Sequence, residues 1–180
     1  MATELGHKLT LEPIAASPVA PEPHPDLLAV NPLGKVPALQ LPSGRVLYGS
    51  QVICRYLGQG TPFYPDGDAH WDAVTREALA DGLVDAALLA RYENHLRPEA
   101  LRWSDWAKGQ MAKVNRALDA MEATRPDAAR FDIGDVATGC ALGYLDFRYP
   151  EIDWRGQYPH LQAFAGIIFA RDSFRDTVPA

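Results

Sequence analysis

The stretch Asn31-Pro-Leu-Gly-Lys-Val-Pro-Ala-Leu39, followed by Ser50-Gln-Val-Ile-Cys-Arg-Tyr-Leu57, decides the fold of this chain. It predicts a turn, an apolar strand at 36–41, a hairpin loop at 42–45, a returning strand at 46–48 and then a helix. Pro37 cannot donate a ladder hydrogen bond, so the first strand is expected to lie at an edge or to bend there.

The chemistry of this stretch suits a small peptide ligand. An X-Pro bond can adopt the cis form far more readily than other peptide bonds, and we predict a cis Val36-Pro37 bond, which would turn the backbone N–H and C=O of Val36 outward. Ser50 stands just before an apolar-periodic run, which predicts a helix N-cap. A capped helix N-terminus favours a carboxylate, and Lys35 adds a cation nearby. We therefore expect a peptide with carboxylates at both ends.

Two motifs resemble a known family. Asn-Pro-x-Gly-x-Val-Pro-x-Leu at 31–39, with the hairpin and the helix that ends in Tyr-Leu, resembles the glutathione-binding half of the glutathione S-transferase family. Gly143-Tyr-Leu-Asp-Phe-Arg148, together with Asp153-Trp-Arg155, resembles its bacterial branch. The resemblance implies a truncated α/β thioredoxin-like domain followed by an all-α helical bundle.

The domain boundary is predicted from composition. A stretch rich in Gly, Pro and Asp at 58–68 separates a partial thioredoxin-like, glutathione-binding domain at 1–60 from an all-helical domain at 68–180. In the second domain, Asp132 as N-cap and Asp135 three residues later predict the start of a buried core helix at 133–148, and a last helix is predicted at 159–173.

A stripe of mostly small residues in this domain suits close helix packing. The resemblance implies a homodimer formed across the helix 71–96, and domain core is the other interpretation of this stripe.

Composition excludes several classes of protein. The 180 residues are 47% hydrophobic and carry a net charge of −6 without a basic cluster, which argues against nucleic acid as a partner. No apolar run approaches membrane-spanning length, and no signal peptide is evident, so a cytoplasmic protein is expected. Cys54 and Cys140 are predicted to be buried, reduced thiols. The five histidines have no metal-ligand spacing, so no metal site is expected.

The N-terminus departs from the family pattern. Members begin with a strand, a loop that carries a catalytic Ser, Tyr or Cys, and a long helix, whereas Met1 to Gly6 predicts only the last turn of that helix, with Gly6 as its C-terminal cap. Ser17 imitates the catalytic loop, but several prolines follow it, so we interpret it as part of a Pro-rich loop at 16–25. The segment 8–15 predicts an edge strand. The family neighbour of this strand is missing, and three outcomes are open. The chain is a fragment that lacks the neighbour, or the strand 8–15 moves inward and pairs with 36–41, or another subunit provides a strand.

The resemblance also implies a glutathione site. Lys35 would bind the glycyl carboxylate, Val36 and Pro37 would present the backbone to the cysteinyl part, and Ser50 would bind the γ-glutamyl carboxylate. Gly49 departs from the family, which commonly has an acidic residue or Gln there, and this weakens the expected affinity.

Two functions follow. The first is a glutathione S-transferase that conjugates or reduces small hydrophobic electrophiles for detoxification, if the missing N-terminal segment is supplied. The second is a non-catalytic binding or scaffold protein of the same fold. Tyr92, Trp103 and Trp106 are candidates for the electrophile pocket. No catalytic residue is assigned, because the thiolate-stabilising loop is the missing part, so negligible transfer to chlorodinitrobenzene is expected.

Overall fold

The computed structural model describes residues 1–19, 22 and 24–179, so part of the predicted loop 16–25 lies outside the described residues. The chain divides into two compact units, Met1–Thr61 and Pro62–Ala180. Each unit is described by itself below.

The chain opens on a helix C-terminal turn, as predicted. The N–H of Gly6 donates to the C=O of Thr3 at 3.0 Å, and the N–H of His7 donates to the C=O of Ala2 at 3.0 Å. This pair of bonds, with Gly6 at a φ of +69°, is the Schellman arrangement that closes a helix.

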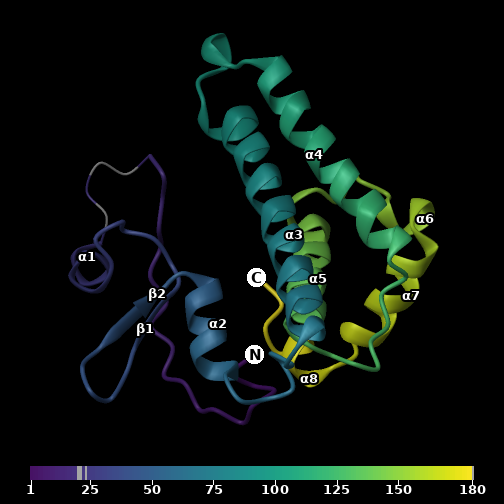
Figure 1. Cartoon of the computed structure of the whole chain (residues 1–180). Helices are drawn as coiled ribbons and strands as arrows, with labels where there is room; N and C mark the ends of the chain where they lie inside the picture. Colours follow the sequence, from purple (N-terminus) through teal and green to yellow (C-terminus); the bar gives the residue numbers. More distant parts are fainter. Residues whose placement is uncertain (20–21, 23, 180) are drawn as a thin grey trace. The chain divides into compact units, whose positions relative to one another are not determined.

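The predicted hairpin is present in unit 1 (Figure 1). Strands β1 (Ala38–Gln40) and β2 (Val46–Tyr48) pair antiparallel, with Leu39 opposite Leu47. The hairpin loop is closed by the N–H of Leu41, which donates to the C=O of Arg45 at 2.8 Å, and Gly44 adopts a φ of +83°. Two helices flank the hairpin in sequence, α1 (Pro25–Val30) and α2 (Ser50–Gly58).

The predicted strand at 8–15 was wrong. Residues 8–15 form no regular element, and Leu9 and Leu11 are exposed. The described sheet contains only β1 and β2. A strand requires a neighbour for its backbone N–H and C=O groups, and alternating apolar residues cannot replace that neighbour.

Unit 2 is helical throughout. Its elements are α3 (Asp68–Arg91), the π-helix η1 (Tyr92–Leu96), the 3-10 helix η2 (Glu99–Leu101), α4 (Ser104–Ala123), α5 (Ile133–Arg148), α6 (Trp154–Gln157), α7 (Pro159–Ile168) and α8 (Asp172–Arg175). The predicted last helix at 159–173 is thus two helices, separated by a turn at 169–171. None of the helices in the described part of the chain is both long and apolar enough to span a bilayer.

Helix α5 is the core helix, as predicted, and α3 lies beside it (Figure 1). The apolar face of α5 packs against α3, α4 and α7 through residues that include Leu142 and Leu145, both fully buried. Gly134 allows the closest approach to α3, because a Cβ atom there would lie 2.8 Å from the C=O of Ala73. Cys140, expected to be buried, is exposed on the other face of α5, and Cys54 is half-buried.

The start of α5 is fixed by a capping box. Asp132 accepts from the N–H of Gly134 at 2.9 Å, and Asp135 accepts from the N–H of Asp132 at 2.9 Å. Arg76 of α3 binds both carboxylates, at 2.5 Å to Asp132 and 2.6 Å to Asp135. The sequence predicted the cap, whereas the arginine that joins it to α3 was missed.

Candidate functional site

A buried asparagine builds the loop that carries the first predicted site residues. Asn31 is 2% exposed and follows α1. Its side chain donates to the C=O of Lys35 at 2.7 Å and accepts from the N–H of Leu33 at 3.0 Å. Because both ends of the amide bind the same loop, the backbone at Lys35 is held in one conformation. The sequence indicates a turn at Asn31, but it carries no signal for the contact between this amide and Lys35.

The predicted backbone site lies at the edge of the hairpin. The Val36-Pro37 peptide bond is cis, as predicted, and Val36 is 55% exposed. In the described part of the chain, the backbone of Val36 makes no hydrogen bond. The C=O of Pro37 accepts from the N–H of Gly49 at 3.2 Å. This bond brings Val36 and Pro37 beside the start of α2.

Ser50 lies at this start, although not in the predicted capping position. Gly49 is the N-cap of α2, with a φ of +88°, and no side chain caps the helix. Ser50 is therefore the first helical residue, and it is exposed. The first N–H groups of a helix have no intrahelical acceptor, so the α2 N-terminus is a place where an anion is stabilised. Lys35 is exposed on the neighbouring loop.

The three residues predicted for an electrophile pocket all lie in unit 2. Trp103 and Trp106 stack at 6.4 Å between ring centroids, and they are 63% and 41% exposed. Tyr92 is half-buried and begins the π-helix η1. The structure thus brings the two tryptophans together, and it places Tyr92 at the end of α3.

A buried carboxylate holds the segment between Tyr92 and the tryptophans. Glu93 accepts from the N–H of Trp103 at 2.6 Å and from Nε of Arg97 at 2.8 Å. The hydrogen bond from Trp103, with the nearby arginines, lowers the pKa of Glu93 despite its burial. Glu93 fixes the backbone of Trp103, and no sequence signal indicated this role because the bond spans ten residues.

A second polar cluster lies where α3 and α5 end. The hydroxyl of Tyr149 donates to the C=O of Ala87 at 2.7 Å, and burial raises its pKa to about 12. The hydroxyl of Tyr144 is also buried, but it has no hydrogen-bond partner in the described residues. Burial raises the pKa of Tyr144 as well, against the opposite effect of Arg91 and Arg148.

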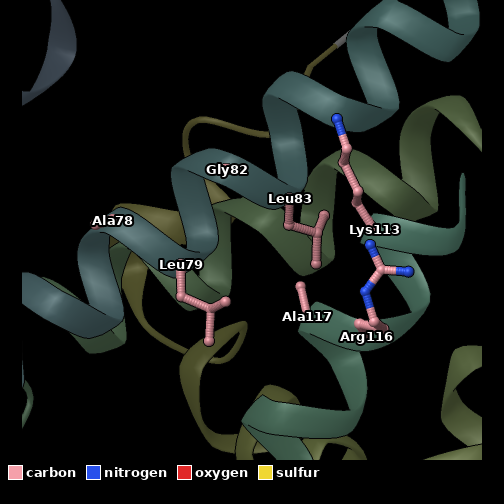
Figure 2. Close-up of a pocket in the computed structure, with 7 residues that line it drawn as sticks. All are labelled: Ala78, Leu79, Gly82, Leu83, Lys113, Arg116 and Ala117. Carbon is pink, nitrogen blue, oxygen red and sulfur yellow. The ribbon is translucent and has the colours of Figure 1, made fainter. Parts of the chain in front are cut away.

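An open groove of about 290 Å³ lies between α3 and α4. Figure 2 shows Leu79 and Leu83 on one side and the long side chains of Lys113 and Arg116 on the other. Ala78, Gly82 and Ala117 complete its lining. None of the predicted site residues lines this groove.

Comparisons with known proteins agree with the two-unit organisation. Residues 1–59 match the family described as "Glutathione S-transferase, N-terminal domain", and residues 86–165 match "Glutathione S-transferase, C-terminal domain". The chain is 34% identical over 157 residues to the uncharacterized GST-like protein YibF of Escherichia coli K12, covering 83% of this chain and 77% of that protein. It is 24% identical over 162 residues to probable elongation factor 1-gamma 1 of Arabidopsis thaliana, covering 38% of that protein.

Solved structures of relatives superpose over almost the whole chain. A glutathione transferase family member from Pseudomonas fluorescens Pf-5 with bound glutathione has a TM-score of 0.93 at 44% identity, covering 99% of this chain and 90% of that one. A glutathione S-transferase from Methylobacillus flagellatus KT with GSH bound has a TM-score of 0.88 at 38% identity, with coverages of 99% and 91%. The Pseudomonas fluorescens structure with bound S-(propanoic acid)-glutathione scores 0.87 at 42% identity, with coverages of 99% and 90%. The chain therefore belongs to the glutathione S-transferase family.

Proposed function

We propose that this protein binds glutathione and uses it to conjugate or reduce small electrophiles. The juxtaposition of Val36 and Pro37 with the α2 N-terminus, made by the bond from Gly49 to Pro37, carries the proposal. The relatives whose structures contain glutathione support the ligand. Two cysteines in 180 residues fit a reducing compartment, which supports cytoplasmic detoxification as the setting.

Each part of glutathione has a proposed partner in unit 1. Val36 offers an N–H and a C=O that are unpaired within the described residues, and these suit the extended cysteinyl backbone in the manner of an added strand. Ser50 and the first N–H groups of α2 suit the γ-glutamyl carboxylate. Lys35 suits the glycyl carboxylate, and the Asn31 amide holds its backbone in place.

Glutathione titration of the full chain by calorimetry tests this site. Both Lys35→Gln and Ser50→Ala are expected to weaken binding, the former by about tenfold, because a hydrogen bond to a charged group is lost. The matched control is Arg45→Gln, which removes an exposed cation of the hairpin loop and should leave the affinity unchanged. Equal affinity for glutathione in Lys35→Gln, Arg45→Gln and the parent chain would contradict the assignment.

We place the electrophile on unit 2, near Tyr92 and the Trp103–Trp106 stack. The two exposed rings offer a flat apolar surface, and Glu93 holds the backbone beneath Trp103. The S-(propanoic acid)-glutathione bound to the Pseudomonas fluorescens relative supports a small substituent with a carboxylate on the sulfur.

We further propose that a second copy of the chain covers the groove between α3 and α4. The exposed residues Ala78 and Gly82 have small side chains, which permit close helix approach. Arg116 on α4 and Asp85 on α3 are exposed, and neither forms an ion pair within the described residues. In a two-fold dimer, each could pair with its opposite on the partner.

A non-catalytic role is the second candidate, and Gly49 favours it. Gly49 carries no side chain beside Ser50, so one contact to the γ-glutamyl end is absent, which lowers affinity. One relative is named as a probable elongation factor and not as a transferase, which fits a role outside glutathione transfer. Glutathione binding without turnover of any electrophile would favour this candidate.

A further inference from the structure

The hydroxyl of Tyr144 is a buried polar group that the protein itself does not satisfy. Among the described residues it has no hydrogen-bond partner, whereas the hydroxyl of Tyr149, five residues later, donates to a backbone C=O. Buried hydroxyl groups nearly always have a partner, since leaving one unpaired costs its full desolvation energy. An unpaired donor at this position is therefore open to an acceptor from outside the chain, such as a water molecule or a ligand oxygen.

The charges around this hydroxyl select the kind of acceptor. Arg148 lies one turn after Tyr144 on α5, so the two side chains share a helix face. Arg91 ends α3, which packs beside α5 (Figure 1), and it is half-buried. Neither arginine pairs with a carboxylate in the described part of the chain. Both arginines are near enough to oppose the rise that burial causes in the pKa of Tyr144. Two cations without carboxylate partners near an unpaired donor favour an anionic oxygen.

We propose that Tyr144 is a binding residue for the second substrate, donating its hydroxyl proton to a carboxylate or similar anionic oxygen that Arg91 and Arg148 attract. This inference rests on the proposed function, in which the second substrate binds unit 2 near Tyr92. It assigns the carboxylate of that second substrate to named residues, so electrophiles with a carboxylate are expected to bind more tightly than neutral ones of the same size.

Tyr144 as a whole residue is half-buried, although its hydroxyl oxygen is covered. Arg148 is exposed, and its guanidinium lies 3.8 Å from the centre of the Phe147 ring. A long arginine side chain can change rotamer without any change in the backbone. Ligand binding requires such a side-chain movement, which lets an entering carboxylate contact both the guanidinium and the hydroxyl.

The test uses the full chain and two probes, 3-phenylpropanoate and the neutral alcohol 3-phenylpropanol, titrated by calorimetry. Tyr144→Phe is expected to weaken 3-phenylpropanoate binding by about tenfold and to leave 3-phenylpropanol binding unchanged. Its thermal midpoint should not fall, because no hydrogen bond within the protein is lost. The matched control is Tyr158→Phe, whose hydroxyl donates to Asp119 at 2.9 Å elsewhere in unit 2. It should retain the affinity of the parent chain for both probes.

Three results would overturn the inference. The first is that the parent chain does not bind 3-phenylpropanoate, and the second is that Tyr144→Phe binds it with the same affinity as the parent chain. The third is a clear loss of thermal stability in Tyr144→Phe, because this would mean that the hydroxyl already has an internal or water partner. Glutathione is titrated into the same samples as a separate measurement. If the parent chain does not bind glutathione, the proposed function is contradicted. The 3-phenylpropanoate titrations of the parent chain and Tyr144→Phe still decide the role of Tyr144.

Discussion

At the scale of single residues, Asp132 has two roles. It caps α5, and it holds Arg76 of α3 with 6% of its side chain exposed. Asp132→Ala removes both interactions and leaves Arg76 with one carboxylate. We expect the free energy of unfolding to fall by about 2–3 kcal/mol, more than a cap alone contributes. Urea denaturation of the parent and the variant measures this difference.

Asp153 provides the matched control for this measurement. It caps the four-residue helix α6 by accepting from the N–H of Gly156 at 2.9 Å, and it is exposed. Asp153→Ala should therefore cost less than about 1 kcal/mol. If both alanine variants lost the same stability, the contact with Arg76 would contribute nothing.

The role of a single residue could be predicted from the sequence where its hydrogen-bond partners are only a few residues away. The capping box at Asp132 was predictable, because its members lie three residues apart. Ser50 was placed one position wrong, since the left-handed φ of Gly49 that moves the helix start is a backbone property without a pattern of its own. The roles of Asn31, Arg76 and Glu93 depend on which groups the folded chain brings near them.

At the scale of elements, α4 supplies the cap for α7. Glu122 accepts from the N–H of His160 at 3.0 Å and of Leu161 at 2.9 Å, which lie in the first turn of α7. Tyr158 is the backbone N-cap of α7, and it makes no side-chain cap bond. Burial alone would raise the pKa of Glu122, but the two N–H donors and the His160 ring outweigh it, so the pKa is lowered.

This lowered pKa gives a pH-dependent prediction. The stabilisation by ionised Glu122 is fully present above its unfolded-state pKa, and it is lost as pH falls through the lower folded-state pKa. Glu122→Gln should therefore reduce the free energy of unfolding by about 1–2 kcal/mol at pH 7. The difference between parent and variant should begin to narrow below about pH 4 and should close once the pH is below the folded-state pKa.

Denaturation curves across this pH range check the expectation, with Asp172→Asn as the control. Asp172 is exposed and forms a surface ion pair with Arg175, so its loss should change stability by less than about 0.5 kcal/mol. A Glu122→Gln difference that stays constant from pH 7 to pH 3 would contradict the capping role of the carboxylate.

Helices and strands could be predicted from the sequence where nearby residues mark their ends. The helix 133–148 and the strand 46–48 were predicted with their observed bounds, because caps and turn residues mark them. The segment 8–15 has strand-like alternation but no neighbouring strand. Alternation in the sequence indicates which side chains of a strand would share a face. It does not indicate whether another strand is present to pair with its backbone.

At the scale of the whole molecule, the proposed dimer makes a simple prediction. The parent chain should scatter light as twice its mass of 19.7 kDa at micromolar concentration. Gly82→Glu places a charge in the groove, and a Cβ atom at this position meets nothing within 4 Å, so the fold should be retained. The variant should therefore scatter as a single chain.

Gly109→Glu is the matched control, since it adds the same side chain to an open position on α4 outside the groove lining. It should keep the mass of the parent chain. A parent mass near 19.7 kDa would exclude the dimer, and an unchanged mass in Gly82→Glu would exclude this groove as its interface.

The Asn31 clamp has a consequence for the chemical lifetime of the protein. Asparagine deamidates when the backbone nitrogen of the next residue attacks the side-chain amide and closes a succinimide ring. The next residue is Pro32, whose nitrogen is already fully substituted and cannot form that ring. Conversion to aspartate would remove the donor that binds the C=O of Lys35 and add a negative charge beside it. The loop proposed to bind glutathione is thus protected against a common form of protein ageing.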